Sequence, residues 1–131
     1  MAHARASIGT VDYATSIATG HHTLAADEGP ELGGKDAGPA PYDLLTSALG
    51  ACTVITLRMY AERKEWNLGG LHIKLRLLKD ADAQHIERTI STSAALDAEQ
   101  QMKLLEIADK TPVTKALAPG VRIQTVLEAG V

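Results

Sequence analysis

Aromatic residues are scarce in this sequence, which has no phenylalanine, one tryptophan and three tyrosines. The core must therefore be packed from aliphatic residues and methionine, within a hydrophobic content of 45% that is ordinary for a globular domain. An aliphatic core offers no aromatic platform on which nucleic-acid bases could stack. The 131 residues suit a single domain, 1–131, and a chain of this length buries roughly two-thirds of the surface that it exposes when unfolded.

Positive charge is not in excess, because 13 Lys and Arg residues are set against 16 Asp and Glu, for a net charge of −3. Nucleic-acid binders carry a basic patch or stripe, so a nucleic-acid partner is not expected. The sequence has no run of 18 apolar residues, and its first seven residues lack the apolar region of a secretory signal. We therefore expect a cytoplasmic protein with no membrane partner.

Cysteine occurs once, as Cys52, which excludes an intrachain disulfide and a cysteine-rich metal site. Taken alone, a cysteine on an apolar helical stripe is most often a small packed hydrophobe. Four polar residues near the N-terminus could be considered as a metal cluster: His21, His22, Asp27 and Glu28. Adjacent histidines on a strand point to opposite faces, so a polar turn and a solvated loop are the preferred interpretation. Neither a metal nor a cofactor is expected.

The clearest predicted element is a helix from Tyr42 to about Trp66, which follows a loop rich in proline and glycine over residues 27–41. Gly50 lies in the middle of this helix, where glycine costs about 1 kcal/mol relative to alanine. Its neighbours are also small, which indicates that another element packs close at this level. Apolar or small residues recur at intervals of three and four, as on one helical face; they are Leu45, Ala48, Leu49, Cys52, Ile55, Thr56 and Met59.

Short β-like stretches precede and follow this helix, at residues 8–11, 15–19, 71–77 and 84–94. Asp97, with Gln100 three residues later, is a capping signal for a second helix, which Pro112 interrupts. The spacing of Val121, Ile123 and Val126 indicates a last strand. This order predicts an α+β fold, with helices lying on an antiparallel sheet.

A proline-rich approach to the long helix, a patch of small residues and the cysteine occur together in this chain. The segments concerned are residues 33–45, 48–53, 58–64 and 104–117. In order and spacing they resemble the OsmC/Ohr family, and in particular its OsmC-like branch, over about residues 20–127. The resemblance implies an intertwined homodimer with the cysteine helix at its centre. For active members it also implies thiol-dependent reduction of organic hydroperoxides.

By this resemblance Cys52 stands at the peroxidatic position, where a thiolate attacks the peroxide and becomes a sulfenic acid. The resolving position, just before Pro112 and Val113, holds Thr111. A threonine hydroxyl cannot form a disulfide, although it can hydrogen-bond a thiolate or a sulfenic acid. An external thiol would then have to recycle Cys52.

Two further departures from the family pattern concern the groups that assist the thiolate. Active members place an N-terminal arginine against the sulfur, but no arginine lies between Ser7 and Leu57, where Lys35 is the only cation apart from any protonated histidine. The family's glutamate falls at Tyr42 or Asp43.

Asp43 precedes Cys52 by nine residues, roughly 13 Å along a regular helix and on its opposite face, so it could act only through a neighbour or the other subunit. Two hypotheses therefore remain. One is a one-cysteine peroxidase that reacts with a small-molecule hydroperoxide. The other is a non-catalytic protein of the same fold that binds a small molecule or serves a structural role.

Overall fold

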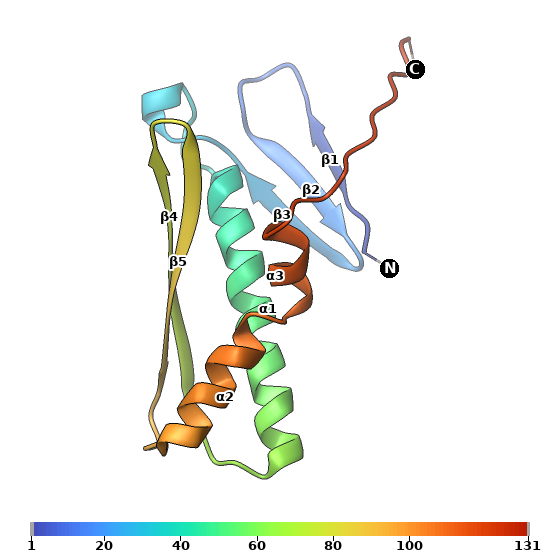
Figure 1. Ribbon diagram of the computed structural model, residues 1–131. Helices are drawn as coiled ribbons and strands as arrows, with labels where there is room; N and C mark the ends of the chain where they lie inside the picture. The colour runs from blue at the N-terminus through green and yellow to red at the C-terminus, as the bar shows by residue number, and fades with distance from the viewer. Residues whose placement is uncertain (1, 131) are drawn as a thin grey trace. The chain divides into compact units, whose positions relative to one another are not determined.

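The computed structural model describes residues 2–130, which fold into five strands, three α-helices and one 3₁₀ helix (Figure 1). The chain divides into two compact units. The first contains the chain up to Ala48 together with Arg76–Glu87, and the second contains Leu49–Leu75 together with the chain from Arg88 onward. The predicted α+β class, with antiparallel sheets and a long cysteine-bearing helix, is confirmed.

The N-terminal part of the first unit is an antiparallel sheet in the order β1-β2-β3 (Figure 1). Its strands are β1 (Arg5–Ile8), β2 (Thr15–Thr19) and β3 (His22–Ala26). The first strand lies three residues earlier than predicted, because its register pairs Arg5 with Ala18 and Ile8 with Thr15. The turn between β2 and β3 is Gly20–His21, where Gly20 has a φ of 57°. His22 was expected in this turn but pairs with Thr19 instead.

The loop before the long helix contains one short element that the sequence analysis did not expect, a 3₁₀ helix at Pro30–Leu32. Proline fits its first position because the N–H that proline lacks would have no partner there. Gly33 ends it with a φ of 92°, a left-handed conformation that glycine adopts without strain. The proline and glycine content therefore excludes a long helix here but not a single turn.

Helix α1 (Pro41–Lys64) matches the predicted long helix to within two residues at its end. Its buried residues are Leu49, Gly50, Thr53, Leu57 and Ala61. The predicted stripe coincides with the buried side only in part, because Leu49 is buried but Ile55 and Met59 are 53% and 57% exposed. From Leu44 to Leu57 the helix carries no charged residue on any side, so periodicity alone does not identify the buried side there. By length and composition alone α1 could also cross a membrane, but the core helix of a soluble protein meets the same criteria.

The core of the second unit is a cluster of Leu57, Ala61, Leu68 and Leu104. Trp66 packs against this cluster, with its ring edge-on to Tyr60 at 5.6 Å between centroids. Strands β4 (Leu71–Asp80) and β5 (Ala83–Thr92) form the second sheet, seen in Figure 1 as a long hairpin. Exposed and half-buried residues alternate along both strands, as on a sheet with one face covered.

Two helices follow the hairpin, α2 (Ala98–Ala108) and α3 (Pro112–Leu117). The capping signal is confirmed, because the Asp97 carboxylate accepts from the Gln100 amide while the Gln100 side chain accepts from the Asp97 amide. The predicted last strand is wrong, since residues 120–130 have no regular structure. Apolar side chains in this segment are 64–90% exposed, so the alternating pattern has no sheet edge to pair with inside the described chain.

Candidate functional site

Cys52 lies on α1 and is a free, partly buried thiol. Its sulfur is 4.0 Å from the Thr56 hydroxyl, one helical turn further on. Thr53, which follows Cys52 in the sequence, is completely buried and donates its hydroxyl proton to the Leu49 carbonyl at 2.7 Å. The cysteine is therefore at the border of the buried stripe and is not sealed in the core.

Thr111 is completely buried and is the N-cap of α3. Its hydroxyl oxygen accepts from the Thr114 amide at 3.3 Å and lies 2.7 Å from the Thr114 hydroxyl. Thr114 in turn donates to the Ala108 carbonyl at 3.2 Å. Because Thr114 spends its proton on that carbonyl, Thr111 is the donor in the pair of hydroxyls. Thr111 is thus tied into the helix that it caps.

Arg88 on β5 connects these two regions of the second unit, and the sequence analysis missed it. Its Nη1 donates to the Thr53 hydroxyl at 3.1 Å and to the Thr114 hydroxyl at 3.0 Å. Its Nη2 lies 3.4 Å from the carboxylate of Asp109, just beyond α2. The Arg88 side chain is only 15% exposed. A signal was present, because Arg88 lies on the same covered face of the strand as Ile86 and Ile90, where a charged residue is unusual.

Asp43 and Tyr42 lie in the first turn of α1, in the first unit. The Asp43 carboxylate accepts from the Ala40 amide at 3.3 Å, which is how an acidic residue in the first turn satisfies the start of a helix. The Tyr42 hydroxyl accepts from the Gln84 side chain at 3.0 Å and the tyrosine is 55% exposed. Both residues therefore have structural contacts of their own within that unit.

Lys35 is exposed in the loop of the first unit, and its amide donates to the Asp27 carboxylate at 3.2 Å. Asp27 is buried and also accepts from the Ala37 amide at 3.1 Å and the Glu28 amide at 2.8 Å. The Ala37 and Glu28 amides, with smaller contributions from Lys35, hold the pKa of Asp27 below its usual value, against the effect of burial. Asp27 thus organises the loop that leads into α1.

The histidines at positions 72 and 85 are exposed on β4 and β5. Among residues 2–130, no three His, Cys, Asp or Glu side chains are grouped so that they could hold a metal ion.

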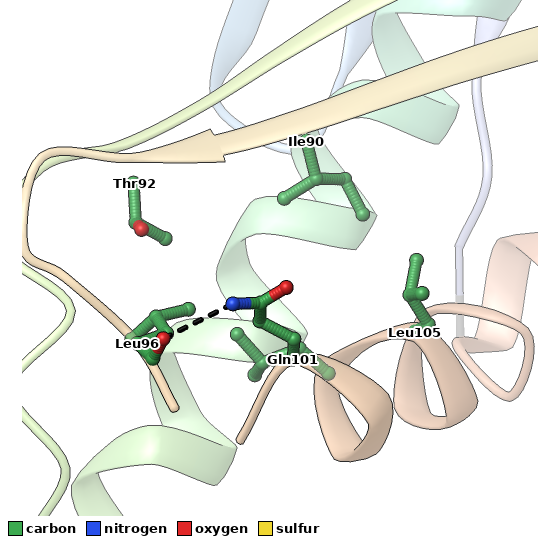
Figure 2. Close-up of a pocket in the computed structure, with 6 residues that line it drawn as sticks. Ile90, Thr92, Leu96, Gln101 and Leu105 are labelled. Carbon is green, nitrogen blue, oxygen red and sulfur yellow. Dashed lines mark hydrogen bonds between the residues drawn. The ribbon is translucent and has the colours of Figure 1, made fainter. Parts of the chain in front are cut away.

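A separate cavity of about 270 Å³ lies between β5 and α2 of the second unit. Figure 2 shows its mostly apolar lining, with the Gln101 side-chain amide donating to the Leu96 carbonyl at 3.0 Å. The lining residues are Ile90, Thr92, Leu96, Gln101, Leu104 and Leu105. Neither Cys52 nor Thr111 lines it, so this cavity does not form the thiol site.

Residues 33–126 match the model of a protein family described as OsmC-like protein. The chain belongs to the OsmC-like family. The resemblance noted from the sequence is thereby confirmed, and the matched segment contains Cys52, Thr111 and Arg88. No curated protein matches the sequence.

Solved structures share the fold of this OsmC-like protein at low sequence identity. An OsmC-like protein from Mycoplasma pneumoniae has a TM-score of 0.70 at 16% identity, covering 89% of this chain and 86% of that one. The organic hydroperoxide resistance protein OsmC of Legionella pneumophila has a TM-score of 0.67 at 17% identity, with 90% and 89% covered. The organic hydroperoxide resistance protein OhrB of Bacillus subtilis has a TM-score of 0.62 at 21% identity, with 90% of each chain covered.

Proposed function

We propose that this OsmC-like protein reduces organic hydroperoxides through Cys52 as a one-cysteine peroxidase. The observation that carries the proposal is a free thiol at the border of the buried stripe of α1, in a chain of this family with no second cysteine. Two fold neighbours are named for organic hydroperoxide resistance, which supports the same substrate class. The reaction needs no metal or other cofactor.

In the proposed reaction the Cys52 thiolate attacks one peroxide oxygen and the O–O bond breaks. The sulfur keeps that oxygen as a sulfenic acid, and the other oxygen leaves with a proton as an alcohol. One external thiol then condenses with the sulfenic acid, releasing water and forming a mixed disulfide. A second external thiol attacks that disulfide, which releases Cys52 and the oxidised reductant. Three residues are proposed to assist the thiol only if the partner subunit of a dimer brings them to it: Asp43, Tyr42 and Lys35.

A non-catalytic role, binding of a small molecule or a structural function, is the second candidate. It is favoured by the buried hydroxyl at position 111, whose hydrogen bonds are used within α3. It is also favoured by the lack of any arginine between Ser7 and Leu57. These two features are departures from the residues that active members use.

We also propose that the protein acts as a homodimer in which a second copy covers the outer side of α1. Ile55 and Met59 project from this side, and only 28% of the most apolar 18-residue window of the helix is buried. The small, exposed residue Ala51 beside them would allow another helix to approach closely. Exposed apolar surface of this kind marks an interaction site, and a second copy provides an identical apolar face.

The test of the proposed activity follows Cys52 during exposure to cumene hydroperoxide. The expected result is a sulfenic acid on Cys52, trapped by a dimedone-type reagent, and peroxide consumption that continues when a small thiol reductant is added. Cys52→Ser should abolish both signals while leaving the circular dichroism spectrum unchanged. A Cys52 that stays unmodified while a cysteine peptide oxidises would contradict the enzyme and favour the non-catalytic candidate.

A further inference from the structure

Arg88 is the feature of the second unit that the proposed reaction does not yet use. It occupies an inward position on β5 between two isoleucines, and its side chain is 15% exposed. Burying a charge is costly unless it is hydrogen-bonded and paired. Arg88 meets that condition with two hydroxyl acceptors on different helices and a carboxylate near the end of α2.

The donor and the acceptor of each hydrogen bond around Arg88 can be assigned. Thr53 gives its proton to the Leu49 carbonyl and Thr114 gives its own to the Ala108 carbonyl. Both hydroxyl oxygens therefore accept the hydrogen bonds from Arg88 with their lone pairs, because the guanidinium can only donate. Thr111 then donates to Thr114, so Thr111 is linked to Thr53 by three successive hydrogen bonds through Arg88.

We propose that Arg88 is a positioning residue for the thiol site. It acts through Thr53, which follows Cys52 on α1, and through Thr114, which is bonded to the residue at the resolving position. Arg88 thereby sets the distance between the cysteine segment of α1 and the first turn of α3. This inference rests on the proposed function for its meaning, since it concerns the two positions that peroxidase chemistry in this family would use.

Arg88 acts through neutral hydroxyls and does not need to touch the sulfur. Its effect is a matter of orientation, and reactions between two positioned groups are sensitive to displacements of about 1 Å, which can cost on the order of 100-fold in rate. A residue that merely stabilised the fold would change the unfolding free energy and leave that rate alone in the folded fraction.

The experiment measures how fast a disulfide forms between positions 52 and 111, as a test of the spacing between them. In a Thr111→Cys background, diamide removes two electrons and two protons from the two thiols as its N=N bond becomes a hydrazine. This reaction depends on the spacing of the thiols, because bridging needs Cα atoms roughly 4.4–6.8 Å apart, and it does not depend on peroxide chemistry. The rate is read by mass spectrometry as the loss of two hydrogens.

We expect the Thr111→Cys protein to form the 52–111 disulfide, and the added change Arg88→Met to slow it by at least about tenfold. Arg88→Lys, which keeps a donor able to serve both hydroxyls, should restore the rate to within about threefold. Arg76→Met is the matched control, because Arg76 is 71% exposed on β4 and pairs with Glu87 at 3.7 Å. This control should leave the rate unchanged.

Equal rates for Arg88→Met and its parent would overturn the inference, as would a parent that forms no disulfide in any arm. If Arg88→Met does not fold, Thr114→Val removes one acceptor and keeps the charge, and it should slow the reaction in the same direction. A fast diamide rate together with a Cys52 that is inert to cumene hydroperoxide would overturn the proposed peroxidase and leave the positioning role intact.

Discussion

Gly50 is the residue whose substitution tests the packing of α1 against β4 most directly. A Cβ atom at position 50 would lie 2.9 Å from Cδ1 of Leu75 and 3.7 Å from Cγ2 of Ile73. Carbon atoms prefer separations of about 3.5–4.0 Å. The close approach expected from the small residues around Gly50 is therefore present, and β4 is the element that makes it.

Alanine and leucine at this position should behave differently. Gly50→Ala removes a helix-interior glycine, which favours the helix by about 1 kcal/mol, and the atom that must move is the terminal methyl of a flexible leucine. The two effects should nearly cancel, leaving the free energy of unfolding within about 1 kcal/mol of the unmodified protein. Gly50→Leu adds three more carbons towards β4 and should destabilise by about 2 kcal/mol or more.

The assay is urea unfolding followed by the fluorescence of Trp66, the only tryptophan, which packs against the core of the same unit. Leu75→Ala provides the double-mutant cycle. Alone it should destabilise by about 2 kcal/mol, and combined with Gly50→Leu it should recover at least about 1 kcal/mol of coupling energy, because the new side chain fills the vacated space. Additive effects, or a Gly50→Leu protein as stable as its parent, would refute the contact.

Two further outcomes are expected. The folded-state pKa of Asp27 is depressed, so its stabilising contribution should be full above about pH 4 and disappear as pH falls through the folded pKa. Urea unfolding of the protein and of Asp27→Asn should therefore converge in acid, and a pH-independent difference would contradict the role of the amides of Ala37 and Glu28. Sedimentation at micromolar concentration should show a dimer that Ile55→Glu dissociates. The control Ser91→Glu, at an exposed position of β5, should leave the dimer intact. A monomeric parent would refute the homodimer.

Local signals in the sequence predicted the elements that depend on few distant contacts. The Asp97 and Gln100 pair predicted the start of α2 because a capping box is complete within four residues. The alternation of residues 71–77 predicted β4, since one side of that strand is covered and the other is solvated. Pro41 is the first residue of α1, a position that suits a residue without an N–H.

Features that depend on tertiary partners were predicted poorly. Val121, Ile123 and Val126 have strand-like spacing, but a strand exists only when an edge accepts its backbone hydrogen bonds, and no strand pairs with residues 120–130 within the described chain. The buried side of α1 was predicted only in part, for a related reason. Leu57 and Thr53 face inward and Ile55 faces outward, although hydropathy alone ranks isoleucine as the better core residue.

The difference in burial between neighbouring residues bears on how Cys52 could be recycled. Thr53 and Thr111 are completely inaccessible, whereas Cys52, directly before Thr53 on α1, retains partial exposure. A cysteine kept only for packing would be expected to follow Thr53 into the buried stripe. A peroxidase without a resolving cysteine has the opposite requirement, because an external thiol must reach the sulfur to form a mixed disulfide. The position of Cys52 meets that requirement of the proposed peroxidase, in which the reducing electrons would come from an external thiol because the chain has no second cysteine.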